Sequence, residues 1–449
     1  TIFAVIDATL VRPLPFPGAM RLVTIFNTYP KAGVERDGSS IANYYERQGK
    51  IAAFSSLSMY GFGTAAVGEP GSIATEEITR IAPKFFLTLG KPPALGREFT
   101  ETEMNDHSDQ VAILSDEYWR KHFARDAGVI GRKVWVDGSP RTVVGVLPRG
   151  FHFLSSKSSV YLPLSSSFER RRPQERHSGG NVTQMIARLK TGATIEKAQA
   201  EIDAQNTALE RDDPQAKMIA DAGFRSVVVS LHADQVASVR PILLLLQAGV
   251  LALLLIGAVN LVNLLLIRAN GRLKEIAVRQ ALGATGRRIV MEILAETFVL
   301  TLTGGLLAIA VGAAGVRLVN ALGAERLPLG AFIVFDARVA LAGLIAALGL
   351  GVVLSAPVAW FNFRSFPGRG LQAESRGATS GRATQALRHA FVVAQIALGF
   401  VLLTGSGLLG LSLKRAMAVS PGFRADHTVA GPISVAGKRY PSAEAALVF

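Results

Sequence analysis

The 449-residue chain contains no cysteine and comparatively few charged residues. The absence of cysteine excludes disulfide frameworks and thiolate metal sites, although it does not identify a cellular compartment. Charged residues make up 18% of the chain and the mean hydropathy is +0.32, whereas soluble proteins usually carry about a quarter charged residues. These values indicate a membrane protein, and the length allows two or more domains.

Motifs of catalysis and cofactor binding are also missing. The stretch "GFGTAAVGEPG" from Gly61 has Ala66 where a dinucleotide-binding loop needs its third glycine, and "GATGRR" from Gly283 lacks the spacing of an ATP-binding Walker A loop. We therefore expect no catalytic residue, no cofactor and no ATPase activity in this chain. Seven histidines without metal-ligand spacing predict no metal site; they stand at positions 107, 122, 152, 177, 232, 389 and 427. The acidic stretch 101–109 is interpreted as a solvated loop.

Long apolar runs are abundant instead. Four of them are long enough to cross a bilayer as helices; they are residues 241–267, 293–316, 339–361 and 390–411. The first contains 18 Leu, Ile and Val residues, each of which favours insertion by roughly 0.4 kcal/mol. A shorter run, "TIFAVIDATLV", lacks the features of a signal peptide. We expect it to be the end of a transmembrane helix that begins before Thr1.

The positive charge is concentrated in two short segments. Residues 268–288 carry six basic residues and Glu275, a net of +5, and residues 361–388 carry a net of +4, out of +14 for the whole chain. The positive-inside rule places both segments in the cytoplasm and the large polar segment outside. Since the basic residues flank membrane helices and are not interleaved with aromatics, we expect no nucleic-acid partner.

The polar segment after the first apolar run has a mixed α and β pattern. Alternating valines around Asp137-Gly138 predict a β-hairpin. The stretch "DQVAILSDEYWRKHF" predicts a strand to Leu114 and then a helix with Ser115 as its N-cap. An amphipathic helix is expected over 194–210. Another is expected to begin near Leu231 and to continue without a break into the membrane run.

The segment "RLKEIAVRQALGATGRRI", residues 272–289, lies between two apolar runs. In a helix, one face would carry a thin apolar stripe; the residues that share this face are Leu273, Ile276, Ala277, Gln280 and Ala281. Gly283 suits a helix C-terminus, and Thr285 suits the N-cap of the next helix. A plain topology anchor, attracted to anionic lipid, would explain the charge. It would not explain why a helical face and a Gly-Ala-Thr-Gly turn are specified.

This segment resembles the cytoplasmic coupling segment of MacB/FtsX-type ABC transporter permeases, which commonly reads R-x-x-E-I-x-x-R-x-A-L-G-A. "AETFVLTLTGG" resembles the start of that family's next helix. "RIAPKFFLTLGKPPALGREFT", "VAILSDEYWRKHF" and "GRKVWVDGSPRTVVGVLPRGFHF" resemble its MacB-like core domain, and "VRPLPFP" resembles the segment that leads into it. The order of segments is similar to the duplicated acidobacterial-type orphan permeases, because a fifth helix follows the fourth and a new polar segment begins after it.

The resemblance implies a subunit that works by mechanotransmission with a separate ABC ATPase, which binds the ATP. It implies that Leu273, Ile276 and Leu282 would seat in a groove of that ATPase. Arg272, Arg279, Arg287 and Arg288 would meet acidic groups or lipid, and Glu275 and Gly283 complete the coupling set. Plain anchoring of the segment remains the alternative.

Two further features lie within the apolar runs. Glu296 interrupts one run near its cytoplasmic end, where we expect it to pair with Arg287 or Arg288; a proton-relay role is the alternative. Small residues recur every fourth position and predict close helix packing. They are Gly304, Ala308 and Gly312 in one run, and Gly343, Ala347 and Gly351 in the next.

The expected fold is a membrane α-helical bundle with a large α+β extracytoplasmic domain, similar to the MacB core, inserted between the first and second transmembrane helices. The expected segments are 1–19, the end of a first transmembrane helix; 20–239, the core domain; 240–364, an FtsX-like domain of three helices with a coupling helix at 268–288; 365–388, a cytoplasmic linker; 389–413, a fifth transmembrane helix; and 414–449, the start of a second core domain.

The expected function is that of a permease subunit in a bacterial inner membrane, for export or efflux, with its large domain periplasmic or extracellular. Its partners would be the ABC ATPase, the lipid bilayer and either a second half of a longer chain or a second copy. The alternatives are an FtsX-like regulator of cell-envelope enzymes, or a membrane-anchored sensor or adhesion module without transport.

Overall fold

The computed structural model describes most of the chain. The described residues are 2–69, 72–154, 156–177, 183–211, 213, 215–272, 275, 278–279, 282, 285–323, 335–364 and 379–419. These residues form two compact units, a core domain (9–238) and a helical unit (2–8 and the described residues from 239 to 419). Several predicted features lie outside the described residues: Leu273, Ile276, Gly283, residues 365–378 of the predicted linker 365–388, and residues 420–449.

The core domain is built on one mixed sheet in the order β11-β1-β10-β3-β4-β9-β6-β8-β5, with β2 beside β1 and β7 beside β3 and β8. Most neighbouring pairs are antiparallel, but β4 with β9 and β6 with β8 are parallel. The strands are β1 (Leu22–Tyr29), β2 (Val34–Asp37), β3 (Phe54–Val67), β4 (Ala74–Ile81), β5 (Leu95–Gly96), β6 (Val111–Leu114), β7 (Lys133–Val136), β8 (Ser139–Val146), β9 (Val160–Pro163), β10 (Gln184–Leu189) and β11 (Arg225–Ser230).

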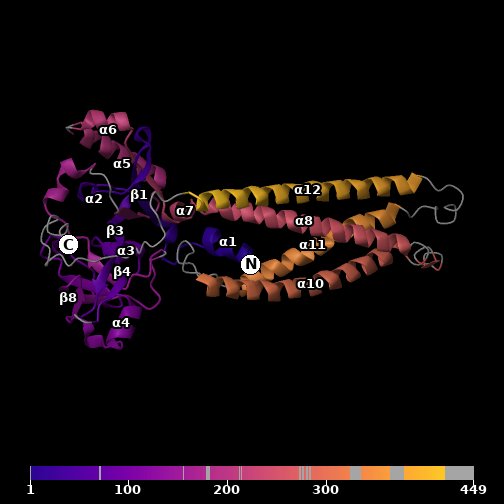
Figure 1. Cartoon of the computed structure of the whole chain (residues 1–449), viewed down its shortest axis with the longest axis horizontal. Helices are drawn as coiled ribbons and strands as arrows, with labels where there is room; N and C mark the ends of the chain where they lie inside the picture. Colours follow the sequence, from indigo (N-terminus) through magenta and orange to yellow (C-terminus); the bar gives the residue numbers. More distant parts are fainter. Residues whose placement is uncertain are drawn as a thin grey trace. The chain divides into compact units, whose positions relative to one another are not determined.

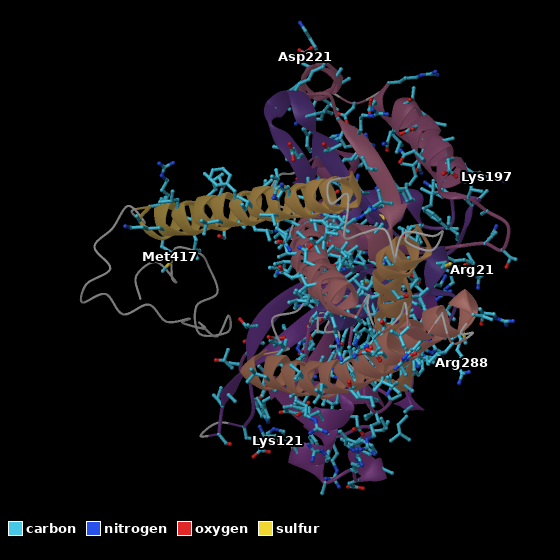
Figure 2. All side chains as sticks on the ribbon, turned by 90° about the vertical axis from the view of Figure 1, so that its right-hand side faces the viewer. Arg21, Lys121, Lys197, Asp221, Arg288 and Met417 are labelled. Carbon is cyan, nitrogen blue, oxygen red and sulfur yellow. The ribbon has the colours of Figure 1, made fainter. Side chains whose placement is uncertain are left out.

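Six α-helices accompany this sheet in the described part of the core domain (Figure 1). They are α2 (Ile41–Arg47), α3 (Phe85–Leu89), α4 (Asp116–Phe123), α5 (Ile195–Glu210), α6 (Ala216–Ala222) and α7 (Leu231–Val236). The exposed Lys121 of α4 and Lys197 of α5 extend outward from their helices (Figure 2). Helices α2 and α5 cover one part of the sheet through Tyr44, Ala198 and Ile202, which are buried among strand residues.

Several local predictions are confirmed. Strands β7 and β8 form the expected hairpin, and Asp137 and Gly138 both have positive φ, at 49° and 71°, as a two-residue type I′ turn requires. Ser115 caps α4 by accepting a hydrogen bond from the amide of Tyr118 at 3.1 Å. Helix α5 begins directly after its cap Thr194.

Two other local predictions are wrong. Helix α7 ends at Val236, and three turn residues separate it from α8, so the expected continuous helix is interrupted. The acidic stretch is only partly solvated, because Glu103 is buried and pairs with Arg97 at 2.7 Å while closing a capping box with Thr100. The spacing of Thr100 and Glu103 is that of a capping box and is visible in the sequence, whereas the burial of Glu103 depends on the rest of the fold.

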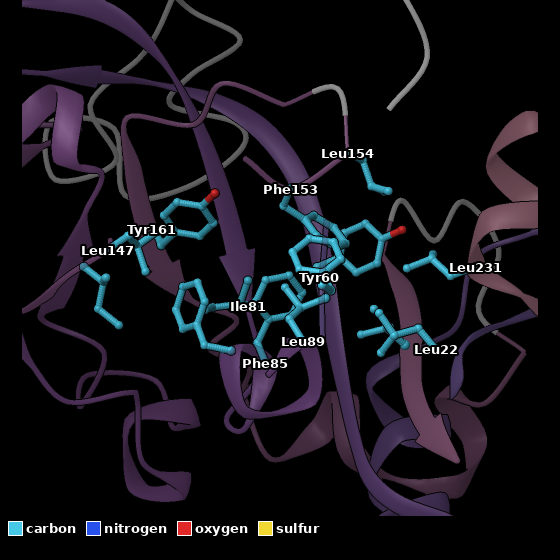
Figure 3. Packing of buried hydrophobic residues seen from close by; sticks show 14 of the residues in the cluster. Leu22, Tyr60, Ile81, Phe85, Leu89, Leu147, Phe153, Leu154, Tyr161 and Leu231 are labelled. Carbon is cyan, nitrogen blue, oxygen red and sulfur yellow. The ribbon is translucent and has the colours of Figure 1, made fainter. Parts of the chain in front are cut away.

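The centre of the core domain is an aromatic cluster (Figure 3). Phe153 packs edge to face on Tyr60 and Phe85, with ring centroids 4.7 and 4.9 Å apart, and all three residues are at most 1% exposed. Each such pair adds about 0.5–1.5 kcal/mol beyond the burial of area. The cluster also contains Leu22 at the start of β1 and Leu231 at the start of α7, so the first and last parts of the domain share one core.

Four long helices form most of the helical unit. They are α8 (Arg240–Gly271), α10 (Gly286–Gly323), α11 (Ala337–Arg364) and α12 (Thr379–Met417). Each contains a stretch long and apolar enough to cross a membrane; the four stretches are Arg240–Leu265, Leu294–Ala321, Ala337–Ala356 and His389–Met417. A short helix α1 (Ile2–Ile6) is followed by a π-helical turn, Asp7–Val11.

Candidate coupling site

The connection between α8 and α10 contains the basic segment. Among its described residues, Glu275, Val278 and Arg279 are helical, and the amide of Leu282 donates to the carbonyl of Val278 at 3.1 Å. Helix α10 begins at Gly286, directly after Thr285. The predicted apolar residues Leu273 and Ile276, and the predicted turn at Gly283, lie outside the described residues.

Salt bridges connect the basic segment to the start of α10. Arg279 donates to both carboxylate oxygens of Glu292, at 2.9 and 3.1 Å, and also to Glu275 one turn before it. These hydrogen bonds, the one to Glu292 first, raise the pKa of Arg279. The segment is therefore tied to α10 by charge-assisted hydrogen bonds, which are stronger than neutral ones.

Glu296 pairs with Arg268 of α8 and with Arg272, which directly follows that helix, contrary to the prediction that it would pair with Arg287 or Arg288. Its two carboxylate oxygens accept from Arg268 at 2.8 Å and from Arg272 at 3.1 Å. The prediction was wrong because it considered only neighbours on the same helix, whereas Arg288 is eight residues away and lies about two turns along α10. The arginines at and directly after the end of α8 lie within ion-pair distance of the Glu296 carboxylate, and those at the start of α10 do not.

Glu292 is the residue of this network that the sequence reasoning missed. Glu292 and Glu296 are four residues apart and so share one face of α10. That spacing, opposite a segment rich in arginine, was the available signal. With both acids included, residues 268–296 carry six basic and three acidic side chains, a net of +3. Arg272 and Arg279, which the resemblance directs toward a partner or lipid, thus have partners within the chain.

Two apolar side chains of the segment are exposed, and so are two arginines that form no ion pair with a described residue. Leu282 is 83% exposed and Val278, one helical turn earlier, is 60% exposed. Val278 was also missed, although its i, i+4 spacing to Leu282 marks a common face. Arg287 and Arg288 are exposed and form no ion pair with a described residue; Arg288 projects from the start of α10 (Figure 2). These four side chains can contact another molecule.

Packing between α10 and α11 uses only some of the predicted small residues. A Cβ on Gly351 would lie 2.6 Å from Thr301 Oγ1, and one on Gly305 would lie 3.1 Å from Ala347 Cβ. Gly351, Ala347 and the neighbouring Gly305 therefore mark the close approach. Gly304, Gly343 and Ala308 are exposed, and Gly312 is half-buried. On α10 the contact is made by Gly305 and not by the predicted Gly304, so the contacting face is rotated by about 100° around the helix axis from the predicted one.

The other helices of the unit also make specific contacts. Val262 of α8 and Leu354 of α11 are buried in one apolar cluster, and Phe391 of α12 packs against it. The Gln395 side chain of α12 donates to the carbonyl of Ile256 in α8 at 3.1 Å. Interhelical hydrogen bonds of this kind stabilise helix association within a bilayer.

Within the described residues, no group of three or more His, Asp and Glu could hold a metal ion.

Two family models match the chain. Residues 1–205 match the MacB-like periplasmic core domain, and residues 248–367 match the FtsX-like permease C-terminal model. The second match includes the whole basic segment with Glu292 and Glu296, and three of the four long helices lie largely within it. The order of the two matches is the order of the core domain and the helical unit.

Curated relatives agree with these matches. The chain is 28% identical over 231 residues to the ABC transporter permease YknZ of Bacillus subtilis, covering 51% of this chain and 54% of that protein. It is 26% identical over 262 residues to the macrolide export ATP-binding/permease protein MacB of Sodalis glossinidius, covering 57% of this chain and 38% of that protein. The chain thus matches about half or less of the length of these relatives.

Among solved structures, the periplasmic region of MacB from Actinobacillus actinomycetemcomitans is similar, with 16% identity, a TM-score of 0.32 and coverage of 50% of this chain and 94% of that one. The two family models and the relatives identify a multi-pass membrane protein with a periplasmic core domain ahead of its helices. The chain belongs to the ABC transporter permeases of the MacB/FtsX type.

Proposed function

We propose that this chain is the permease subunit of an export or efflux system in a bacterial inner membrane, and that its basic segment receives force from a separate ABC ATPase. Closure of the ATPase would push on the segment between α8 and α10, and the helices would transmit the movement to the extracytoplasmic core domain. The chain itself would do no ATP chemistry, in accord with the absence of a Walker A motif from its sequence.

The observation that carries this proposal is the pair of exposed apolar side chains on a segment fixed by ion pairs. Val278 and Leu282 lie outside the candidate membrane spans, which end at Leu265 and resume at Leu294. Arginines surround them in the sequence, so lipid tails do not account for their exposure. An apolar pair rimmed by charge is typical of a protein-binding surface. Arg287 and Arg288 would then face acidic groups of the ATPase.

Force transmission also requires that the segment move together with the helices. The pairs Arg279–Glu292, Arg268–Glu296 and Arg272–Glu296 join the segment, the end of α8 and the start of α10. Because these pairs are partly exposed, each contributes little to stability. Their role in this proposal is to fix geometry, so that displacement of one element displaces all three.

The test is co-purification of the full chain with a co-expressed ABC ATPase subunit. Val278→Asp and Leu282→Asp place charge on the apolar pair, and each should weaken binding by roughly tenfold or more, because a central apolar contact at an interface is lost and a charge is desolvated. Met218→Asp is the matched control, since Met218 is 61% exposed and belongs to the core domain. Unchanged binding of both variants, with correct membrane insertion, would refute the docking site.

A further inference from the structure

A second group of charged side chains belongs to the core domain. Arg21, in a 3₁₀ turn (Ala19–Arg21) just before β1, and Arg188, in β10, direct their guanidinium groups to the same point. A Cβ on Gly18 would lie 3.1 Å from Arg188 Nη1 and 3.2 Å from Arg21 Nη2. Gly18 also has a φ of +59°, which favours glycine. The bare backbone there leaves room for two cationic groups.

The protein only partly satisfies the donors of this arginine pair. Arg188 is 9% exposed; its Nε donates to the carbonyl of Thr88 at 2.7 Å and its Nη1 to the carbonyl of Gly18 at 3.3 Å. Its Nη2 is buried and has no hydrogen-bond partner among the described residues. Arg21 donates to Thr191 Oγ1 at 3.1 Å. Neither arginine forms a salt bridge with a described carboxylate.

Other buried arginines of the same domain are compensated. Arg176 donates to Glu46 at 2.7 Å and to Asp213 at 3.0 Å. Arg47 is buried without a carboxylate, but it donates to Ser226 at 2.6 Å and to Asn206. The pair at Gly18 differs because two like charges are adjacent. Burial, and then the charge of Arg21, lower the pKa of Arg188.

An oxyanion would complete this arrangement. Guanidinium groups present forked N–H donors that match phosphate oxygens, and an anion between two of them removes the like-charge repulsion and supplies missing acceptors. We propose that Arg21 and Arg188 form a phosphate-binding site at the Gly18 turn. This proposal is independent of the coupling function.

The sheet register suggests where such a phosphate would come from. Leu22 is opposite Arg188, and the next residue of β1, Val23, is opposite Ser230 at the end of β11. Ten residues after Ser230 the first long apolar helix begins. Met20, beside Arg21, is 87% exposed, and Leu87, beside Thr88, is 59% exposed. Exposed apolar groups beside paired arginines suit a phospholipid headgroup, and free phosphate has the same chemistry.

The experiment is hydrogen–deuterium exchange of the full chain in maltoside micelles, whose detergent contains no phosphate. One arm adds inorganic phosphate at constant ionic strength, and the other mixes anionic phosphatidylglycerol into the micelles. Either arm should slow exchange in peptides covering residues 17–22 and 184–190. Protection by free phosphate indicates a soluble ligand, and protection by the anionic lipid alone indicates a headgroup.

Variants make the test specific. Arg21→Gln removes one charged fork at a partly exposed position and should weaken the protection by about tenfold or more in ligand concentration, or in anionic lipid fraction. Arg188→Gln should do the same if it folds. Lys190→Gln is the control, because Lys190 is exposed on the same stretch of chain and should leave protection unchanged. No protection in either arm, or protection that survives Arg21→Gln, would overturn the site.

Discussion

At the scale of single residues, burial decides the chemistry of His177 in the core domain. Its Nδ1 is 3.1 Å from the hydroxyl of Tyr29, its ring packs edge to face on Phe224, and its Nε2 is buried without a described partner. Burial lowers the pKa of His177 to about 4, assisted by the charges of Arg176 and Arg47 and opposed by that of Asp213. The native state therefore holds the neutral ring.

This shift predicts a pH-dependent stability. The pKa of an unfolded histidine is near 6.5. Between about pH 6.5 and pH 4, the unfolded state therefore binds a proton at this residue and the folded state does not. The contribution of the neutral ring to the free energy of unfolding is fully present above this window and decreases as the pH falls through it. Because the ring keeps some contact with solvent, we discount the loss to about 1 kcal/mol, or about 2–4 °C in the unfolding midpoint.

The measurement is the thermal unfolding midpoint of the full chain at pH 7 and pH 5. His177→Gln keeps a hydrogen-bonding side chain but cannot take up a proton, so its midpoint should fall less between the two pH values than that of the wild type. Acidic groups titrate equally in both proteins. Identical pH dependence of the two proteins would show that His177 is already protonated, or accessible, in the native state.

At the scale of elements, the salt bridges at the start of α10 hold three pieces of chain together. Glu296→Gln removes the carboxylate shared by Arg268 and Arg272. Each partly exposed pair is worth about 0.2–1 kcal/mol, so the first turns of α10 and the last turn of α8 should exchange amide hydrogens about two- to fivefold faster. Global unfolding should change little.

Hydrogen–deuterium exchange at peptide resolution measures this effect, and Glu275→Gln is the matched control. Glu275 pairs with Arg279 four residues later in the same segment, so its loss leaves the connection between α8 and α10 in place. If Glu296→Gln and Glu275→Gln alter exchange in α10 equally, the interhelical pairs do not fix the geometry.

The same elements show what the sequence could reveal. The Asp137-Gly138 hairpin and the Ser115 cap depend on residues close together in the chain, and pattern therefore predicts them. The partners of Glu296 depend on which segments meet in space. Six basic residues precede Glu296 between positions 268 and 288, and only the approach of the end of α8 selects Arg268 and Arg272. Likewise, periodicity gives the spacing of small residues but not which face of α10 meets α11.

At the scale of the whole molecule, composition was the most informative property of the sequence. Low charge, long apolar runs and clustered arginines predicted four long membrane helices, and each coincides with a candidate span. The family matches place a periplasmic core domain before them. Which side of the membrane each part occupies remains a prediction from loop charge. The absence of cysteine makes it directly testable, because one introduced thiol is a unique label.

Two single-cysteine variants should react with an impermeant maleimide on opposite sides of the membrane. Lys121→Cys lies on exposed helix α4 of the core domain and should label in intact spheroplasts. Arg288→Cys lies at the exposed start of α10 and should label only after permeabilisation, because the positive-inside rule places the basic segment in the cytoplasm. Gly138 is a poorer position for the label, since its φ of +71° would strain a cysteine. Labelling of Arg288→Cys in intact spheroplasts would put the segment outside, where no ATP-driven subunit could reach it, and would contradict the proposed function.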